Sequence, residues 1–359
     1  MAYTTIDDPS AHFQTKIYTG NGGALAVTND GNSDLQPDFV WFKKRGASES
    51  HALFDTSRGI DRFVSSNSDA VEQHQPTTGN TDADDIASFD SDGFTFQGGG
   101  GAINQSSNTY VAWQWKANGG SRTTNTESGN NPGGGYQANT TAGFSIVDYT
   151  GTGATGTMAH GLGAVPHMMF FKNRGTGQTW VVYHHKNTSA PATDMLQLEA
   201  NNATNDSNTY FNDTAPTSSV FTVATSNDLN KDADGIIAYC FTSIQGYSKF
   251  GSYKGNGDAD GTFIYLGFKP AYFLLKSTDI TQHWYVFDTA RDTYNPSNST
   301  IQPSTNNAQQ TGYAMDFLSN GFKIRHNDGA WNGSGNSYIY MAFVEHPFVS
   351  SKGVPTTAR

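Results

Sequence analysis

Short apolar runs separated by polar turns make up most of the chain. The runs are five to seven residues long, rich in Phe, Tyr, Val and Ile, and bounded by Gly, Pro, Asn or Asp. This length and composition favour buried β-strands over helices, which need longer segments with a period of about 3.6 residues. Segments 180–183 and 284–287 are predicted to be further strands. The pattern therefore predicts an all-β protein.

The same frame of motifs occurs three times along the sequence. Each copy opens with Tyr-x-Gly-x-Gly, at Tyr18, Tyr149 and Tyr253, and a Pro follows 19, 17 and 17 residues later. Each Pro begins an apolar run that ends in Lys, and a second apolar run closes the copy. These pairs of runs are 37–43 and 110–115, 166–172 and 236–241, and 270–276 and 338–343. A period of about 100 residues suits a small domain and is too long for a solenoid turn, so a tandem array is predicted.

Each copy is predicted to be an antiparallel β-sandwich of jelly-roll-like form, because a sheet that buries an aromatic face needs a second layer. The expected segments are an N-terminal leader (1–15), copy one (16–117), a linker (118–142), copy two (143–246), copy three (247–349) and a C-terminal tail (350–359). The linker is rich in Gly, Asn, Ser and Thr, which is typical of a flexible or loosely packed connection. We therefore expect copies two and three to dock tightly and copy one to be set apart.

Composition and charge exclude some partners. Lys and Arg number 21 against 32 Asp and Glu, which gives a net charge of −11. A groove that follows a phosphate backbone needs clustered Lys and Arg, so nucleic acid is not an expected partner. The sequence has no apolar run of about 18 residues and no signal-like N-terminus, so we expect synthesis in a cytoplasm without membrane insertion. Cys240, the only cysteine, is expected to be a small buried hydrophobe.

An Asp-x-x-Arg element occurs at the same place in copies one and three, as Asp55 with Arg58 and Asp288 with Arg291. A carboxylate beside a guanidinium suits acid–base catalysis with a cationic stabiliser, and it also suits a turn that follows a strand. Recurrence at one spacing favours the structural interpretation, because an active site seldom needs a duplicate. Copy two has His184 at the position of the Asp.

Copy two has four histidines that are candidate metal ligands: His160, His167, His184 and His185. They lack the spacing of zinc ligands, and no Cys joins them. Adjacent residues on a strand point to opposite faces, so at most one of His184 and His185 faces a given site. No metal site is predicted.

Two segments, 230–235 and 256–261, approach the pattern of a calcium loop. The twelfth position of such a loop needs a bidentate Glu, and here it holds Phe241 and Gly267. Simple Asp-Gly turns are therefore favoured, and calcium held in another geometry stays open as an alternative. The Gly-rich tract 98–101 lacks the Lys-Ser/Thr of a phosphate loop. No cofactor is predicted.

Trp331 is the candidate binding residue. It lies in the Gly-rich segment 327–335 without an evident counterpart in the other copies, whereas Trp180 and Trp284 lie at equivalent positions, as core residues do. A Trp exposed on a loop can stack on a sugar ring, and local packing of the indole is the alternative. The sequence has no Gly-x-Ser-x-Gly element and no evident carboxylate pair, so no catalytic residue is predicted.

Four longer motifs carry a resemblance to a known family: segments 35–45, 51–59, 247–257 and 316–323. Together they resemble virion proteins of tailed bacteriophages, particularly from aquatic hosts, that are described as tail-fibre-like or as structural proteins. The resemblance extends from about residue 12 to residue 348. Copy two departs from the pattern by lacking the Asp-x-x-Arg element, which indicates that this element is not needed in every copy.

The resemblance implies a non-enzymatic protein of the virion. The expected role is a tail-fibre or appendage component that contacts host-surface polysaccharide. A collar, fibre or capsid-decorating protein without a receptor role is the alternative, and a polysaccharide depolymerase is a third hypothesis. Fibre-like virion proteins are commonly trimers, so the expected partners are further copies of the chain, other virion proteins and host polysaccharide.

Overall fold

The protein is built almost entirely of antiparallel strands, as shown by a computed structural model that describes residues 3–74 and 86–356. Helix among these residues is limited to α1 (Asn208–Phe211), α2 (Asn227–Asn230) and the 3-10 turns η1 (Pro9–Ala11) and η2 (Pro191–Thr193). None of these short helices has the length and apolar character needed to cross a bilayer. The all-β prediction is confirmed.

Each copy contains one large antiparallel sheet. The strand with the motif Tyr pairs with the closing strand, which also pairs with the strand after the Pro. In copy one the order is β1 (Phe13–Thr19), β9 (Thr109–Trp115), β3 (Phe39–Lys44), β4 (Ala52–Asp55), β5 (Arg62–Val64) and β6 (Gln73–His74). The sheet of copy two is β10 (Thr123–Asn125), β11 (Gly134–Asn139), β12 (Phe144–Thr150), β19 (Gly235–Phe241), β14 (Met168–Asn173), β15 (Val181–His184), β16 (Asp194–Gln197) and β17 (Asn205–Asp206). The sheet of copy three is β20 (Ser248–Lys254), β27 (Ser337–Pro347), β22 (Phe268–Ser277) and β23 (Tyr285–Asp288).

A smaller sheet covers one face of each large sheet. The small sheets are β2 (Leu25–Val27), β8 (Gly93–Phe96) and β7 (Ile86–Asp90); β13 (Gly156–Ala159) and β18 (Val220–Val223); and β21 (Phe263–Tyr265), β26 (Gly321–Ile324), β25 (Gln310–Leu318) and β24 (Ser297–Thr300). In copy one, Phe42 of the large sheet meets Phe94 of the small sheet with ring centroids 5.0 Å apart. In copy three, Phe273 meets Phe322 at 4.1 Å. The prediction of antiparallel sandwiches is thus confirmed.

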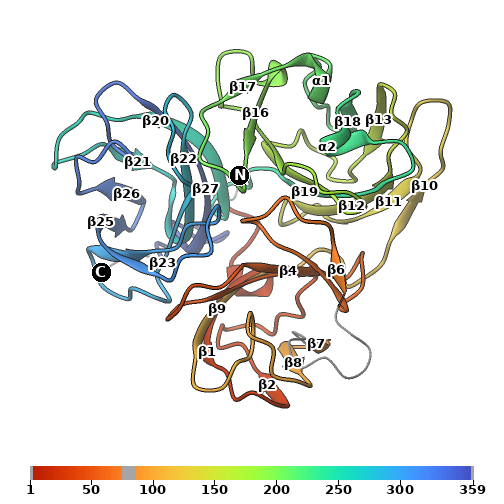
Figure 1. Cartoon of the computed structure of the whole chain (residues 1–359). Coiled ribbons are helices and arrows are strands. Elements are labelled where there is room, and N and C mark those ends of the chain that lie inside the picture. Colours follow the sequence, from red (N-terminus) through yellow and green to blue (C-terminus); the bar gives the residue numbers. More distant parts are fainter. Residues whose placement is uncertain (1–2, 75–85, 357–359) are drawn as a thin grey trace.

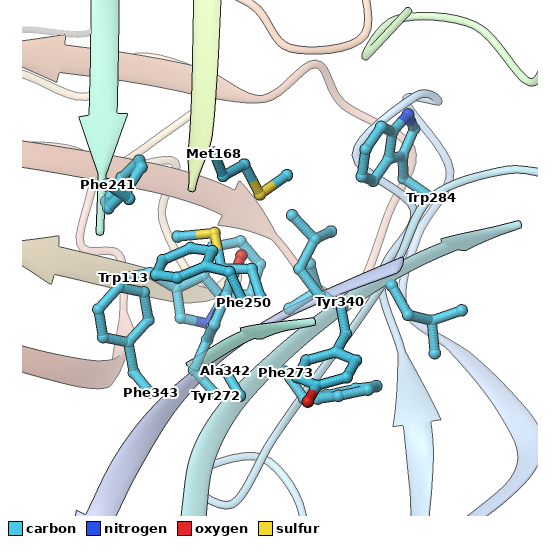
Figure 2. Close-up of a cluster of buried hydrophobic side chains, with 14 of the residues drawn as sticks. Trp113, Met168, Phe241, Phe250, Tyr272, Phe273, Trp284, Tyr340, Ala342 and Phe343 are labelled. Atoms are coloured by element: carbon cyan, nitrogen blue, oxygen red, sulfur yellow. The ribbon is translucent and has the colours of Figure 1, made fainter. Parts of the chain in front are cut away.

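The other faces of the three large sheets meet in one shared core. The copies form three lobes around a common centre, coloured red to orange, olive to green, and blue in Figure 1. At the centre, Trp115, Phe241 and Phe343 occupy equivalent positions of the closing strands, and their ring centroids lie 5.7 to 6.2 Å from one another. Figure 2 shows side chains of copies two and three, including Phe241 and Phe343, gathered beside Trp113 of copy one. The expectation that copy one is set apart is therefore wrong.

The segment expected to be a loose linker contains two strands of the copy-two sheet. Strand β11 pairs with β12 over six residues, and β10 pairs with β11. Gly134 and Gly135 lie within β11, where a Cβ atom would meet a neighbouring backbone oxygen at 2.0 and 2.5 Å. Close strand approach, and not flexibility, is the reason for glycine at these two positions.

Three main-chain clasps close the copies into a ring. In each clasp, a segment near the middle of one copy exchanges two N–H···O bonds with the loop after the Pro-led strand of the next copy. The bonds, donor first, are Glu72–Arg174 (3.1 Å) and Gln178–Asp69 (3.0 Å), Thr204–Thr278 (3.0 Å) and Gln282–Asn201 (2.8 Å), and Gln309–Arg45 (2.9 Å) and Glu49–Asn306 (2.8 Å). The third clasp joins copy three to copy one, so the array is closed and not linear.

Side chains reinforce the ring at a position 14 residues past each Pro. The indole N–H groups of Trp180 and Trp284 donate to the carbonyls of Ser65 and Gln197, each in a neighbouring copy. The corresponding residue of copy one is His51, whose Nε2 donates to Gln302 of copy three at 3.1 Å. The interpretation of Trp180 and Trp284 as core residues agrees with their burial.

The shared core leads us to expect one cooperative unfolding transition for the whole chain. Phe241→Ala removes a ring that touches both other copies, and it should lower the free energy of unfolding by about 3–5 kcal/mol. Differential scanning calorimetry gives the ratio of calorimetric to van't Hoff enthalpy, expected near one. As a control, Phe221→Ala alters only the inner core of copy two and should shift the same single transition. A separate copy-two transition would contradict the shared-core interpretation.

Candidate functional site

The Tyr-x-Gly-x-Gly motif forms a structural turn in all three copies. The motif Tyr hydroxyl donates to a buried main-chain carbonyl near the start of the closing strand: Tyr18 to Ile103 (2.6 Å), Tyr149 to Leu229 (2.6 Å) and Tyr253 to Trp331 (2.7 Å). In copy two, a Cβ on Gly151 would lie 2.2 Å from a backbone oxygen, and Gly153 has φ +67°. The motif therefore needs glycine for close approach and for a left-handed turn, and not for a ligand.

A buried Asn completes each turn. Asn104, Asn230 and Asn332 directly follow the three carbonyl-bearing residues, and each donates its side-chain amide to two main-chain carbonyls. Each also accepts a bond from the N–H of the residue between the motif glycines. Sequence reasoning missed this Asn, although an apolar residue followed by Asn, six residues before the closing run, was a detectable signal.

Trp331 is buried, so its predicted role as an exposed contact is wrong. It is 3% exposed, and its ring packs edge-on against Tyr285 at 4.9 Å and Tyr313 at 4.7 Å. Its counterparts are Ile103 and Leu229, which accept the equivalent hydrogen bonds. A large apolar residue at this place fills the interior of the copy, and the Gly-rich surroundings belong to the turn rather than to a binding loop.

The Asp-x-x-Arg elements are buried ion pairs within turns. Arg58 Nε lies 2.5 Å from Asp55 Oδ2, and Arg291 Nε lies 2.6 Å from Asp288 Oδ2, with no exposed side-chain surface in either pair. The Arg main-chain N–H also donates to the same Asp, and the guanidinium Nη2 donates to a carbonyl of the preceding strand. Neither pair lines a cavity described below. This geometry supports the structural interpretation.

The Asp carboxylate of each pair also accepts a hydrogen bond from a side chain of a neighbouring copy. The hydroxyl of Tyr239 donates to Asp55 at 2.7 Å, and the indole N–H of Trp113 donates to Asp288 at 3.0 Å. At the equivalent place in copy three stands Met341, which has no proton to donate. This explains His184 in copy two: an Asp there would lack a donor, whereas His184 Nε2 donates to the main-chain carbonyl of Tyr340 at 3.2 Å.

Three of the four histidines gather between copies two and three. The ring centroids of His167 and His185 lie 4.2 Å apart, and those of His184 and His185 lie 5.3 Å apart. Burial lowers the pKa of all three imidazoles, to about 4 for His185. The described residues hold no group of three or more His, Cys, Asp or Glu arranged for a metal ion. The arrangement acts as neutral packing between two copies.

One ion-pair network differs between two equivalent clasps. Between copies one and two, Glu72 receives Arg58 Nη1 at 3.3 Å and Arg174 Nε at 2.7 Å. Between copies three and one, Gln309 stands in the position of Glu72 and accepts from Arg45 Nε at 2.8 Å. Arg291 Nη1 is buried there without a hydrogen-bond partner. The clasp between copies three and one therefore lacks the carboxylate that Glu72 supplies between copies one and two.

The candidate functional site is a surface cavity of about 830 Å³ on copy three, which we call the outer groove. Its lining residues are Lys269, Thr289, Thr293, Asn295, Phe317, Leu318, Ser319, Asn320, Glu345, His346 and Thr356. They come from β22, β25, β27 and the loops around them. A bulge in the β22–β27 pairing at Pro270 lies beside Lys269 and adjusts the direction of the strand ends.

An exposed aromatic residue belongs to a loop that lines the outer groove. Tyr294 lies in sequence between the lining residues Thr293 and Asn295 and is 85% exposed, more than any other exposed large hydrophobic side chain of the described residues. Asn295 fixes this loop, because its side chain donates to Phe317 O at 2.8 Å and accepts from Phe317 N at 2.9 Å. An apolar ring held in water by an anchored loop is a feature of contact surfaces.

The polar groups of the outer groove suit hydrogen bonding to a ligand with many hydroxyls. Lys269 Nζ and Glu345 Oε1 form an ion pair at 2.9 Å, with 30% and 29% of the side chains exposed. Such a pair contributes little to stability, so both groups can serve a ligand. Glu345 Oε2 has no hydrogen-bond partner. Glu345 is the one carboxylate among the lining residues, whereas glycoside hydrolysis typically uses two.

Comparison with known families assigns the chain over almost its whole length. Residues 8–347 match a family described as "Domain of unknown function (DUF7483)", and the chain belongs to this family. Searches of curated proteins and of solved structures gave no match.

Gln309→Glu should complete the ion-pair network between copies three and one, because the new carboxylate would pair with Arg45 and with the unpartnered Arg291 Nη1. We expect the free energy of unfolding to rise by about 1–2 kcal/mol in urea titrations. The reciprocal change, Glu72→Gln, should lower it by about 1–3 kcal/mol. Gln310→Glu adds the same charge at the adjacent residue and serves as the control. Equal effects of the two Glu variants would refute the network explanation.

Acid should loosen the contact between copies two and three. An unfolded chain protonates its histidines near pH 6.5, whereas burial keeps His184 and His185 neutral in the fold to lower pH. The unfolded state then binds more protons, so stability should fall as pH drops from about 6.5 toward 4. His185→Gln keeps a donor for Phe250 O and should make this fall shallower. The exposed His346→Gln is the control, and an unchanged slope in His185→Gln would count against the explanation.

Proposed function

We propose that the protein is a virion component of a tailed bacteriophage, a tail-fibre or appendage subunit that contacts host-surface polysaccharide through the outer groove. The motif resemblance in segments 35–45, 51–59, 247–257 and 316–323 supports the virion assignment. The partners in this proposal are host polysaccharide, other virion proteins and further copies of the chain.

The observation that carries the binding role is the exposed ring of Tyr294, on a loop whose neighbouring residues line a groove rich in amides and hydroxyls. Sugar rings present C–H groups on their faces and hydroxyls on their rims. An aromatic ring packs on the faces, while amides, hydroxyls and a carboxylate bond the rims. The outer groove supplies both kinds of contact. A single weak site of this kind gains strength when many copies stand on one particle.

The alternative is a collar, fibre or capsid-decorating role without a receptor. The closed ring favours it in one respect, because a compact unit with three fused copies is a stable building block. The aromatic surface of the large sheets is largely used between the three copies of one chain. Self-association would therefore rely on other surfaces.

A glycan array of bacterial surface polysaccharides tests the binding role with the intact protein. Tyr294→Ala should weaken binding about fivefold, which corresponds to about 1 kcal/mol for one lost ring contact. Phe263→Ala removes another partly exposed ring of copy three, outside the lining residues, and should leave binding unchanged.

The outcomes separate the three roles. Equal binding by both variants would remove Tyr294 from the site. Absence of binding by folded protein to every polysaccharide would favour the particle-building role. Release of reducing sugar ends from a bound polysaccharide would add the depolymerase role, and Glu345→Gln should then abolish the release while binding persists.

A further inference from the structure

The three junctions between copies are built alike, and one of them is incomplete. At the junction of copies one and two, strand β11 lies against β12, with Gln137 opposite Ile146. Gln137 is buried and also contacts copy one, where Thr56 Oγ1 donates to it at 3.2 Å and it donates to Ser57 Oγ at 2.7 Å. An added strand therefore fills this junction.

The junction of copies three and one has a cavity at the equivalent place, which we call the junction groove. Its volume is about 330 Å³. Thr289 and Ala290 line it and follow Asp288 as Thr56 and Ser57 follow Asp55. Thr15 also lines it, three residues before the motif Tyr of copy one, as Ile146 precedes the motif Tyr of copy two.

Strand β1 is an open edge along this groove. In the described part of the chain, β1 pairs only with β9, whereas its counterpart β12 is paired on both sides. Phe13, Gln14 and Thr15 of β1 line the groove. An unpaired strand edge offers main-chain donors and acceptors to an added strand.

At the junction of copies two and three, side chains fill the position that β11 fills between copies one and two. There, His185 Nε2 donates to Phe250 O of the edge strand β20 at 3.1 Å, and His167 packs on His185. The residues at these positions in copy three are Thr289 and Ala271. Their short side chains leave the junction groove unfilled.

Unpartnered oxygens and charge indicate the chemistry of an occupant. Thr15 Oγ1 and Glu345 Oε2 are buried without a hydrogen-bond partner, and both residues line the groove. Asp7, Asp8 and Asp30 are further lining residues, and the chain as a whole carries a net charge of −11. A basic segment of another protein suits this wall better than a second copy of the same acidic chain.

We propose that the junction groove binds an extended, basic polypeptide segment of a partner protein, which adds to β1 as an antiparallel strand in the way that β11 adds to β12. Main-chain hydrogen bonds to β1 supply affinity, and the acidic wall selects Lys and Arg beside the strand. Thr289, Glu345 and His346 line both grooves, but the junction groove is centred on β1 and its occupant requires no sugar contact.

The test uses the full chain and a fluorescent peptide with the β11 sequence, Gly-Gly-Tyr-Gln-Ala-Asn, flanked by two Lys at each end. We expect saturable binding in fluorescence anisotropy and slower amide hydrogen exchange in β1. The same peptide flanked by Asp should bind at least tenfold more weakly, and 0.5 M salt should weaken the Lys peptide. Binding without protection of β1, or equal binding of both peptides, would overturn the proposal, as would no binding up to millimolar concentration.

A matched variant fills the groove with groups that the chain already uses. Ala271→His with Thr289→His reproduces the pair His167 and His185, and it should abolish peptide binding. Ser319→His places an imidazole in the outer groove outside the junction groove and should leave peptide binding unchanged. If the double variant fails to fold, hydrogen exchange of β1 in the natural sequence decides the question. Peptide binding retained by a folded double variant would refute the site.

Discussion

The contact among Trp115, Phe241 and Phe343 is the interaction on which the rest of the structure depends. Each large sheet has two apolar faces, and its own small sheet covers only one of them. The second face must be buried against something else, since exposed aromatic surface of this size is costly in water. Three copies solve this by turning these faces toward one centre, where the last aromatic residues of the closing strands meet. The clasps and the buried ion pairs then stabilise the ring arrangement that burial of these apolar faces favours.

The ring explains why equivalent positions carry different polar residues. Asp55 and Asp288 accept hydrogen bonds from Tyr239 and Trp113. Copy three has Met341 at the position of these donors, and His184 donates to a main-chain carbonyl instead. Each junction is thus satisfied as a pair of residues from two copies. Arg291 is the exception, because Gln309 replaces the carboxylate found at the corresponding clasp. Differences among the copies follow from the neighbour across the junction, and not from the copy in isolation.

The two candidate binding surfaces also lie where the three copies differ from one another. The junction groove exists because Ala271 and Thr289 are small where copy two has two imidazoles and where copy one is covered by β11. The outer groove adjoins it and shares Thr289, Glu345 and His346 with it. The outer groove lies on copy three, and the junction groove lies between copies three and one. The edge strand β1 is uncovered there, whereas β11 covers its counterpart β12 between copies one and two. The proposed glycan and the proposed protein partner would therefore bind at neighbouring places.

Local features of the fold could be predicted from sequence patterns: the short apolar runs predicted the strands, the spacing of Tyr-x-Gly-x-Gly predicted three equivalent units, and the recurrence of Asp55–Arg58 as Asp288–Arg291 favoured a structural pair. These features are set by neighbours within a few residues or within one copy, so a pattern records them. Tertiary structure alone decided that copy one shares the core, that the linker adds strand β11, and that Trp331 is buried. It also decided where the grooves lie, because each depends on side-chain volumes brought together from distant parts of the chain. A sequence pattern records which residues are apolar or small, but only packing determines which of them are covered and which leave a cavity.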